Sequence, residues 1–511
     1  MTQHNSTNMI TRPQKHGISL EILWFLIILS GFLFFSSLIP LPPNDFWWHL
    51  KIGEYIYTNH SIPTTNMFAW TIPTDQPFFY AAWLAEFLFY ALYRLGGIAL
   101  IITTRTVLLG ITVCLVAIEA RRQSNSWRIT AVVITTLCLM IINNLIVRPQ
   151  IWAWLPFISL YIILKRYTDG NLSWHWLLIS PVIMIFWVNV HGSYILGLIL
   201  PGVFFLGEAV SKFLKQPKVL NWHQIGWIGC SGLLSGLAVL VNPRFVGIIN
   251  YSIKLLTDPP SQQLIEEWQS PTPQGLANIF FFISILFFII ILAYSKYRPA
   301  ITEIILFSGF LWIAWSGQRY VIWFGMIITP LLSRLIKDLP LKLPAFISQK
   351  NWLNLVLAVV IFIPLIVVQP WFIEQLPLPS TYWQQVLRES PAGPLISIET
   401  PVAATEYLKA HPGGHLFNEM GYGSYLIWAF PEQSVFMDPR VELFPYEQWM
   451  DYVHINNGSN YNKIFMKYGV DRILLDKKLQ PDLAAALVDD HLWKLEYDDQ
   501  YAQIWTLTTV P

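Results

Sequence analysis

Long apolar stretches alternate with short polar connections over the first 370 residues. Most of these stretches approach or exceed about 18 residues, the length that an α-helix needs to cross a hydrocarbon core about 30 Å thick. The first stretch is too long for the apolar region of a signal peptide, and no small-x-small cleavage site follows it, so we expect an uncleaved span. The pattern predicts eleven membrane spans, at 18–40, 98–118, 129–147, 150–164, 174–188, 193–211, 222–241, 277–295, 300–317, 319–336 and 352–370.

A further apolar segment, 78–95, is interpreted as an amphipathic helix lying in the membrane interface, with Glu86 and Arg94 facing water. With this segment outside the bilayer, one set of connections carries sixteen Lys and Arg residues and the opposite set carries six. The positive-inside rule then places the N-terminus in the cytoplasm. Because the number of spans is odd, we expect the residues after the last span to lie outside, in a multi-pass protein of the cell membrane.

Composition agrees with this assignment. Hydrophobic residues make up 54% of the chain and charged residues 12%, whereas soluble globular chains carry about 25% charged residues. The mean hydropathy is +0.46. The three cysteines all lie within apolar stretches and predict no disulfide framework. The predicted fold class is therefore an α-helical polytopic membrane protein.

The last part of the chain, 371–511, has a different pattern and is predicted to form a small extracytoplasmic α/β domain, here called the tail domain. It has nine Lys and Arg residues against eighteen Asp and Glu residues, which argues against nucleic acid or anionic lipid as its partner. The membrane domain would then be 1–370, with a first outer loop at 41–97. Short strands, alternating in part with helices, and a terminal hairpin are expected at 414–418, 434–438, 471–476 and 493–507.

Polar residues of the tail domain gather after its first two predicted strands. Asn418, Glu419, Asp438, Arg440 and Glu442 lie within a short stretch of the sequence. The end of a strand is a place where an α/β domain presents side chains to a ligand. The other interpretation is a salt-bridged strand end that packs against the membrane domain, and the sequence leaves both open.

Polar side chains also gather at the span ends that the charge distribution places outside. A charged residue at the centre of a span costs about 2.5–3.5 kcal/mol, so such residues usually face a cavity. Each also has an ordinary explanation, because arginines at span ends snorkel to headgroups and histidines or tryptophans favour the interface. We predict a site for an anionic, lipid-linked substrate at this face, formed by Asp45, His49, Arg148, Gln150, Asn189, His191, Asn242, Arg244, Glu266, Glu267, Gln318 and Arg319, with Arg105 inside the second span.

Several segments resemble the GT-C superfamily of membrane glycosyltransferases, in particular bacterial relatives of the dolichyl-phosphate-mannose–protein mannosyltransferases and aminoarabinose transferases. The most specific is the first outer loop, "PPNDFWWHLKIGEYIYTNHSIPTTNMFAWT", where an acid follows the first span. "PFFYAAWLAEFLFYALYRLGG" is similar to the juxtamembrane helix of that family. The blocks "VNVHGSYILGL", "NPRFVGI" and "SGQRYVIWFGMIITP" extend the likeness over most of the chain.

The resemblance implies transfer of a sugar from a polyprenyl-phosphate-linked donor to an acceptor lipid, glycan or protein at the extracytoplasmic face. It makes Asp45 the catalytic candidate, as a base or metal-linked carboxylate. Many members have a second acid close to the first, but here the next acid is Glu54, nine residues on. No metal-ligand motif supports a divalent metal, so the cofactor stays open. The substrate-binding candidates are His49, Arg105, Arg148, His191, Arg244, Glu266 and Arg319.

Two other classes of function remain as alternatives. A transporter or flippase of lipid-linked or envelope substrates also needs polar groups inside a helical bundle. Transporters often contain internal repeats and broken helices near mid-membrane, whereas this sequence shows no repeat and its polar groups lie at one face. A non-catalytic envelope assembly protein is the third class. An enzyme with an outward-facing site fits the distribution of polar residues best.

Overall fold

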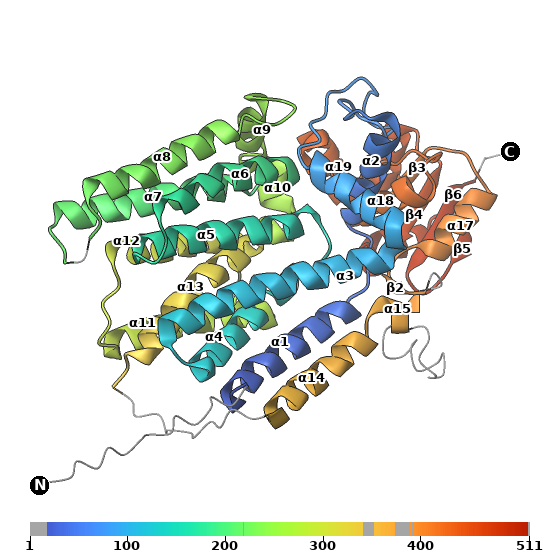
Figure 1. Cartoon of the computed structure of the whole chain (residues 1–511). Helices are drawn as coiled ribbons and strands as arrows, with labels where there is room; N and C mark the ends of the chain where they lie inside the picture. The colour runs from blue at the N-terminus through green and yellow to red at the C-terminus, as the bar shows by residue number, and fades with distance from the viewer. Residues whose placement is uncertain (1–17, 218, 341–351, 374–388, 391–392, 509–511) are drawn as a thin grey trace, which may run out of the picture.

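The computed structural model describes residues 18–217, 219–340, 352–373, 389–390 and 393–508. A bundle of long helices fills one part of the molecule, and the tail domain lies at one end of that bundle together with the helix that follows the first span (Figure 1). Each of the eleven predicted spans overlaps one helix of the bundle: α1(Leu20–Leu38), α3(Trp83–Ser124), α4(Trp127–Met140), α5(Trp154–Thr168), α6(Ile179–Val190), α7(Tyr194–Phe213), α8(Trp222–Ala238), α11(Leu276–Tyr294), α12(Ile301–Ser316), α13(Val321–Lys337) and α14(Trp352–Val367).

Five basic residues that contribute to the predicted charge distribution lie outside the described residues, namely Arg12, Lys15, Lys218, Lys342 and Lys350.

The connections between the long helices hold the shorter elements. The short helices are α2(Phe46–Asn59), α9(Gly247–Leu256), α10(Pro259–Leu264) and α15(Pro370–Ile373), and the 3₁₀ turns of the bundle are η1(Ile142–Asn144), η2(Pro149–Ala153), η3(Trp174–Leu178), η4(Glu266–Trp268) and η5(Gln318–Tyr320).

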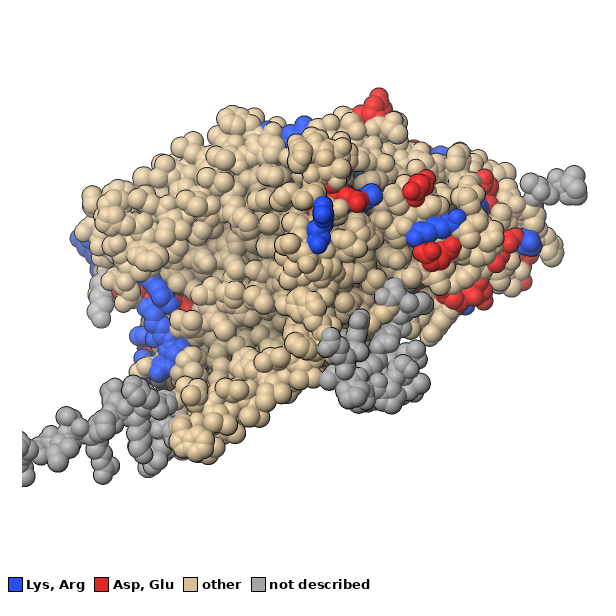
Figure 2. All heavy atoms as spheres, turned by 45° about the vertical axis from the view of Figure 1, so that its right-hand side comes forward, with Lys and Arg blue, Asp and Glu red and all other residues tan. Residues whose placement is uncertain are grey.

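Length and composition make several of these helices able to cross a membrane. Within the described residues five are long and apolar enough, namely α1, α3, α7, α11 and the run from Gln318 to Lys337. Helix α4 is shorter than predicted because a 3₁₀ turn and a loop replace its last turns, whereas α12 nearly matches its predicted span. Figure 2 shows a surface of the bundle that is almost free of charge, with Lys, Arg, Asp and Glu confined to its ends and to the tail domain. An uncharged belt of this kind suits contact with lipid.

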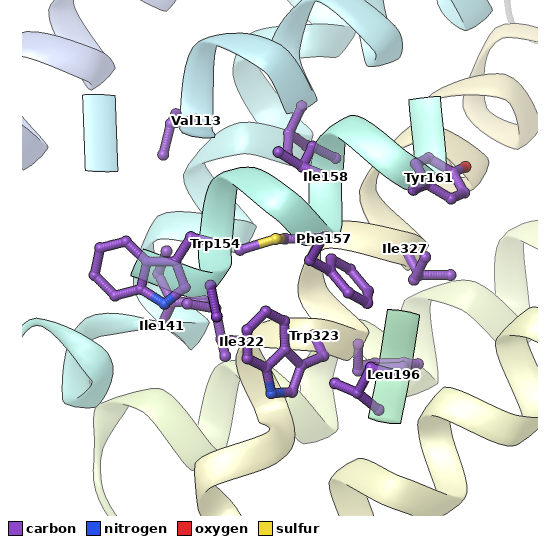
Figure 3. Close-up of a cluster of buried hydrophobic side chains, with 14 of the residues drawn as sticks. Val113, Ile141, Trp154, Phe157, Ile158, Tyr161, Leu196, Ile322, Trp323 and Ile327 are labelled. Atoms are coloured by element: carbon purple, nitrogen blue, oxygen red, sulfur yellow. The ribbon is translucent and has the colours of Figure 1, made fainter. Parts of the chain in front are cut away.

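Aromatic packing at the centre of the bundle fixes α5 against α13. The ring of Phe157 lies 4.9 Å from that of Trp323 and 5.5 Å from that of Phe310, measured between ring centres. Figure 3 shows Trp154 and Phe157 of α5 beside Trp323 of α13, with all these side chains buried. Because η2 leads into α5 and η5 leads into α13, this packing brings the polar residues of the two 3₁₀ turns to the same end of the bundle.

Helix α3 consists of two pieces. Gly96 and Gly97 leave helical geometry, and Gly97 has a φ of +60°, which a residue with a side chain adopts at a cost. The piece before the kink is the predicted interface helix. Arg94 is exposed as expected, but the prediction that Glu86 faces water is wrong, since Glu86 has no exposed surface. Helix α2 covers the face of α3 that carries Glu86, which hydropathy alone could not indicate.

The tail domain contains a four-stranded sheet in the order β3-β4-β6-β5. Strands β3 and β4 are parallel, and the other neighbours are antiparallel, so the predicted βα-type sheet forms only one parallel pair. The strands are β1(Glu389–Ser390), β2(Gly393–Ser397), β3(Leu416–Asn418), β4(Arg472–Asp476), β5(Trp493–Asp498) and β6(Ala502–Leu507), and the helical elements are α17(Val402–Ala410), α18(Met420–Ala429), η6(Val441–Leu443), α19(Tyr446–Asn456), α20(Tyr461–Tyr468) and α21(Pro481–Val488).

The predicted strand at 434–438 is wrong. That segment forms a single bridge, in which Val435 pairs with Ala69 of the first outer loop. Val435 donates to the carbonyl of Phe68 at 2.9 Å, and Trp70 donates to the carbonyl of Val435 at 3.0 Å. The apolar pattern of the segment therefore reflects burial against the loop instead of membership of the sheet.

The first outer loop and the tail domain share one hydrophobic core. Trp48, Ile52, Phe68 and Phe78 of the loop are buried in the same cluster as the sheet residues of the tail domain. The predicted boundary at residue 370 thus separates two segments that pack together, and the linker 374–388 lies outside the described residues. The position of the first outer loop depends on the tail domain.

Candidate active site

Three charged residues from distant parts of the chain meet at the end of the bundle where α1 leads into α2, here called the α2 end. Arg148 precedes η2, Glu267 lies in η4 and Arg319 lies in η5. Arg148 donates to Glu267, and Nη1 of Arg319 lies 3.3 Å from the other carboxylate oxygen. Burial opposes ionisation of Glu267, but the Arg319 and Arg148 guanidiniums outweigh it and lower the pKa of Glu267 to about 2. Glu267 is therefore ionised and bridges both arginines.

Asp45 lies beside this group, as the residue that opens α2. Burial raises the pKa of Asp45, the charges of Arg148 and Arg319 oppose that rise, and the charge of Glu267 adds to it. A hydrogen bond from its own backbone also opposes the rise, but burial outweighs it. The site thus presents a carboxylate whose proton affinity is higher than that of an ordinary aspartate, and such a group can accept a proton from a hydroxyl.

His191 follows the last residue of α6 and completes the group. The backbone N–H of Ser193 donates to its Nδ1 at 3.1 Å, and the Ser193 hydroxyl lies 2.7 Å from the same atom. Trp187 in turn donates to that hydroxyl at 3.1 Å. Burial, followed by the charges of Arg319 and Arg148, lowers the pKa of His191 to about 3. His191 is therefore neutral, with Nδ1 as acceptor, which leaves Nε2–H as a donor.

His49 lies one turn after Asp45 on α2. Its Nδ1 is 2.9 Å from Oε1 of Glu86, and its ring packs against Trp48 with centres 3.6 Å apart. Burial, followed by the charges of His191 and Arg148, holds the pKa of His49 well below its usual range. The structure thus brings six of the predicted residues together: Asp45, His49, Arg148, His191, Glu267 and Arg319.

Two other predicted residues lie apart from this group. Arg105 is fully buried in α3, where it donates to the carbonyls of Ser36 and of Ile39, the latter at 3.0 Å. It thereby supplies side-chain donors to carbonyls at the C-terminal end of α1. Glu266 is exposed, and its neighbour Glu267 is the acid that pairs with Arg148. The roles of Arg105 and Glu266 in substrate binding stay predictions.

Arg244 borders a cavity of about 780 Å³ at the α2 end. Its guanidinium lies 5.3 Å from the ring centre of Phe79, and its side chain is exposed. The cavity wall is mainly apolar and is formed by the end of α2, the start of α3, the end of α6 and α9, with Trp83, Phe87 and Asn189 among the lining residues. Asn189 is two residues from His191, so the cavity reaches the neighbourhood of the charged group.

The polar residues of the tail domain form an internal contact. Asp438 and Arg440 are buried and paired at 2.6 Å, and Arg440 also donates to Tyr80 at 3.2 Å and to Asn66 at 3.3 Å. Glu442 accepts a hydrogen bond from the Tyr251 hydroxyl at 2.7 Å. Of the two interpretations that the sequence left open, the geometry supports a salt-bridged contact with the rest of the protein.

The fold of the chain is similar to those of solved membrane-protein structures. No family model and no curated protein matches the chain. Among solved structures, the apo oligosaccharyltransferase of Archaeoglobus fulgidus matches with a TM-score of 0.50 and 11% identity over 96% of this chain and 74% of that one. ArnT from Cupriavidus metallidurans bound to undecaprenyl phosphate matches with a TM-score of 0.50 and 12% identity over 96% and 98%, and its apo form with 0.50 and 13% over 95% and 97%.

The chain has a GT-C fold. This confirms the predicted fold class, an α-helical polytopic membrane protein of GT-C type that carries a C-terminal α/β domain. At 11–13% identity the likeness establishes the fold alone, so the chemistry has to be argued from the residues of the site.

The residues of the site do not fit a resident divalent metal. Among the described residues no three His, Cys, Asp or Glu side chains are arranged to hold an ion. Glu267, the acidic residue beside Asp45 in the site, is already paired with the guanidiniums of Arg148 and Arg319.

Proposed function

We propose that the protein is a membrane glycosyltransferase that moves a sugar from a polyprenyl-phosphate-linked donor to a hydroxyl of an acceptor at the extracytoplasmic face. The observation that carries the proposal is the meeting of Asp45 with Arg148 and Arg319 on a GT-C fold. The positive-inside distribution supports a cytoplasmic N-terminus, which would put the α2 end and the tail domain outside. One structural neighbour, ArnT, was solved with undecaprenyl phosphate, which supports a lipid phosphate as the donor carrier.

In the proposed reaction the acceptor hydroxyl gives its proton to the Asp45 carboxylate. The acceptor oxygen forms a bond to the anomeric carbon, and the bond between that carbon and the phosphate oxygen breaks. Polyprenyl phosphate leaves with the electron pair. Arg148 and Arg319 stabilise the charge that develops on the phosphate, because each guanidinium offers parallel N–H donors to phosphate oxygens. His191 contributes the Nε2–H donor.

A single displacement with inversion suits this set of residues. It needs one carboxylate as base and no second carboxylate as nucleophile. Asp45 has no acidic neighbour on α2 before Glu54, and Glu267 is neutralised by its two arginines. Glu267 holds Arg148 and Arg319 in place, and an incoming phosphate would compete with it for their N–H groups.

The test is transfer from a panel of polyprenyl-phosphate sugars by the purified protein in vesicles, followed by mass spectrometry of the lipid and acceptor fractions. At least one donor is expected to lose its sugar to a hydroxyl-bearing acceptor and yield free polyprenyl phosphate. Movement of intact donor between leaflets without cleavage would instead identify a flippase.

The apolar cavity beside Arg244 is proposed to take the prenyl chain near its phosphate, with Arg244 attracting the anionic donor at the rim. Arg244→Ala is expected to raise the donor KM roughly tenfold, which corresponds to about 1.4 kcal/mol, with a much smaller change in kcat. Lys254→Ala is the matched control, because Lys254 is an exposed basic residue of α9 outside the cavity lining. Equal KM values for the two variants would remove Arg244 from the donor site.

A further inference from the structure

Glu86 is a fully buried carboxyl group that the sequence did not assign to the site. It lies on the first piece of α3, has no exposed surface and places Oε1 2.9 Å from Nδ1 of His49. Its other oxygen, Oε2, is buried and has no hydrogen-bond partner among the described residues. A buried polar atom without a partner destabilises a fold, because it has lost its hydrogen bonds to water and gained none in return. A pair that served only to hold two helices together would be better built from apolar side chains, so Glu86 calls for another explanation.

The contact between Glu86 and His49 depends on a close approach of α2 to α3. Gly53 lies four residues after His49, on the same face of α2. A Cβ atom at Gly53 would lie 2.1 Å from the Glu86 carbonyl oxygen, a distance that no side chain tolerates. The absence of a side chain at Gly53 therefore lets the two helices come close enough for Glu86 to reach the imidazole.

The imidazole of His49 contacts Glu86 and lies close to the charged group of the site. Its Nδ1 is occupied by Glu86, and among the described residues Nε2 makes no hydrogen bond. The backbone N–H of His49 donates to the carbonyl of Asp45 at 3.2 Å, so the two residues are held one turn apart. Arg148 and His191 are the charged and titratable groups of the site whose fields reach the ring. Nε2 is thus the ring nitrogen left for a ligand of the Asp45 site.

We propose that Glu86 is a positioning residue, which fixes the His49 imidazole so that its Nε2 hydrogen-bonds a hydroxyl group of the bound substrate beside Asp45. This inference rests on the proposed function. A hydroxyl both donates and accepts hydrogen bonds, so it can pair with either tautomer of the ring. Glu86 acts through His49 and touches no substrate itself.

A double-mutant cycle tests whether Glu86 acts through His49. The variants are Glu86→Leu, His49→Phe and their combination, with transfer kinetics, melting temperature and polyprenyl phosphate binding measured for each. Glu86→Leu is expected to lower kcat about 10²-fold, the size of effect that misplacement of a reacting group by about 1 Å can cause. The donor KM, the binding of polyprenyl phosphate and the melting temperature should stay near wild type. The double variant should be no slower than His49→Phe alone.

A conservative variant separates position from fold. Glu86→Gln keeps an amide that can pair with Nδ1, so it is expected to retain most of the wild-type kcat even if Glu86→Leu does not fold. Glu54→Gln, at a partly exposed acid on the same helix α2, is the matched control. Losses that multiply in the double variant, or a Glu86→Gln variant as slow as Glu86→Leu, would overturn the proposal.

A spectroscopic measurement keeps this inference separate from the proposed function. The ring nitrogens of ¹⁵N-labelled His49 are compared between wild type and Glu86→Leu, with and without added undecaprenyl phosphate. The Nδ1 signal is expected to shift in the variant, and the population of the two tautomers should become mixed. An unchanged Nδ1 signal would contradict the positioning role. Absence of transfer from every donor by wild type would overturn the proposed function while leaving the result on the His49 ring intact.

Discussion

Asp45→Asn is expected to lower sugar transfer by about 10²–10⁴-fold, the range seen when a positioned proton-transfer group is lost. Asparagine keeps the size of the side chain but cannot accept the proton of the acceptor hydroxyl at neutral pH. Transfer from the active donor is measured in vesicles at matched protein content. Asp75→Asn, an exposed acid of the same outer loop, serves as the control and should transfer at the wild-type rate.

The same variant should be at least as stable as wild type at neutral pH. Because burial raises the pKa of Asp45 above its ordinary value of 3.8, the native state binds the proton more tightly than the unfolded state does. Ionisation of Asp45 therefore destabilises the fold once the pH rises above 3.8, the ordinary pKa of the group. The melting temperature of Asp45→Asn should equal or exceed that of wild type at pH 7, and any gain should vanish as the pH falls to 3.8 and below. Wild-type turnover by Asp45→Asn would refute the role of Asp45 as base.

Arg440→Ala is expected to lower the free energy of unfolding by about 3–5 kcal/mol, more than any of the other substitutions. Removal of the guanidinium leaves Asp438 buried without its cation and takes donors from Tyr80 and Asn66. It also removes a cation from between the rings of Phe68 and Phe78, whose centres lie 5.1 and 5.3 Å away.

Transfer activity should fall with stability in this variant, because Arg440 joins the tail domain to the loop that carries Asp45. Thermal melting in detergent and limited proteolysis of the first outer loop measure the effect. Lys409→Ala breaks an exposed pair with Glu406 at 2.7 Å and should change the free energy of unfolding by less than about 1 kcal/mol. If Arg440→Ala melted like Lys409→Ala, the shared core of loop and tail domain would not be what holds the loop in place.

The helices of the bundle could be predicted from the sequence because hydropathy is a local property. Each apolar run of sufficient length became a helix, and the errors were confined to ends such as 141–147, where a 3₁₀ turn replaces the predicted helix. Contacts between segments that are distant in the sequence could not be predicted in this way. The segment 434–438 has the composition of a strand, but it pairs with Ala69 of the first loop, more than 350 residues earlier.

The residues of the site likewise fall into those that the sequence indicated and those that it did not. Asp45, Arg148 and Arg319 could be singled out because many polar residues gather at the span ends of one face and because the first loop resembles that of the GT-C superfamily. Glu267 could not be chosen over Glu266, since adjacent acids in a loop have no period that indicates which faces inward. Glu86 was expected to face water because an isolated amphipathic helix would have left it there.

The most direct test of the proposed chemistry is a cryo-EM structure of the protein with undecaprenyl phosphate in a lipid nanodisc. We expect phosphate oxygens to lie within hydrogen-bonding distance of Arg148 and Arg319, on the side that faces Asp45, with the prenyl chain leading to the cavity beside Arg244. A phosphate bound at the opposite end of the bundle, or at the α2 end but out of reach of both arginines and Asp45, would contradict the proposed glycosyl transfer.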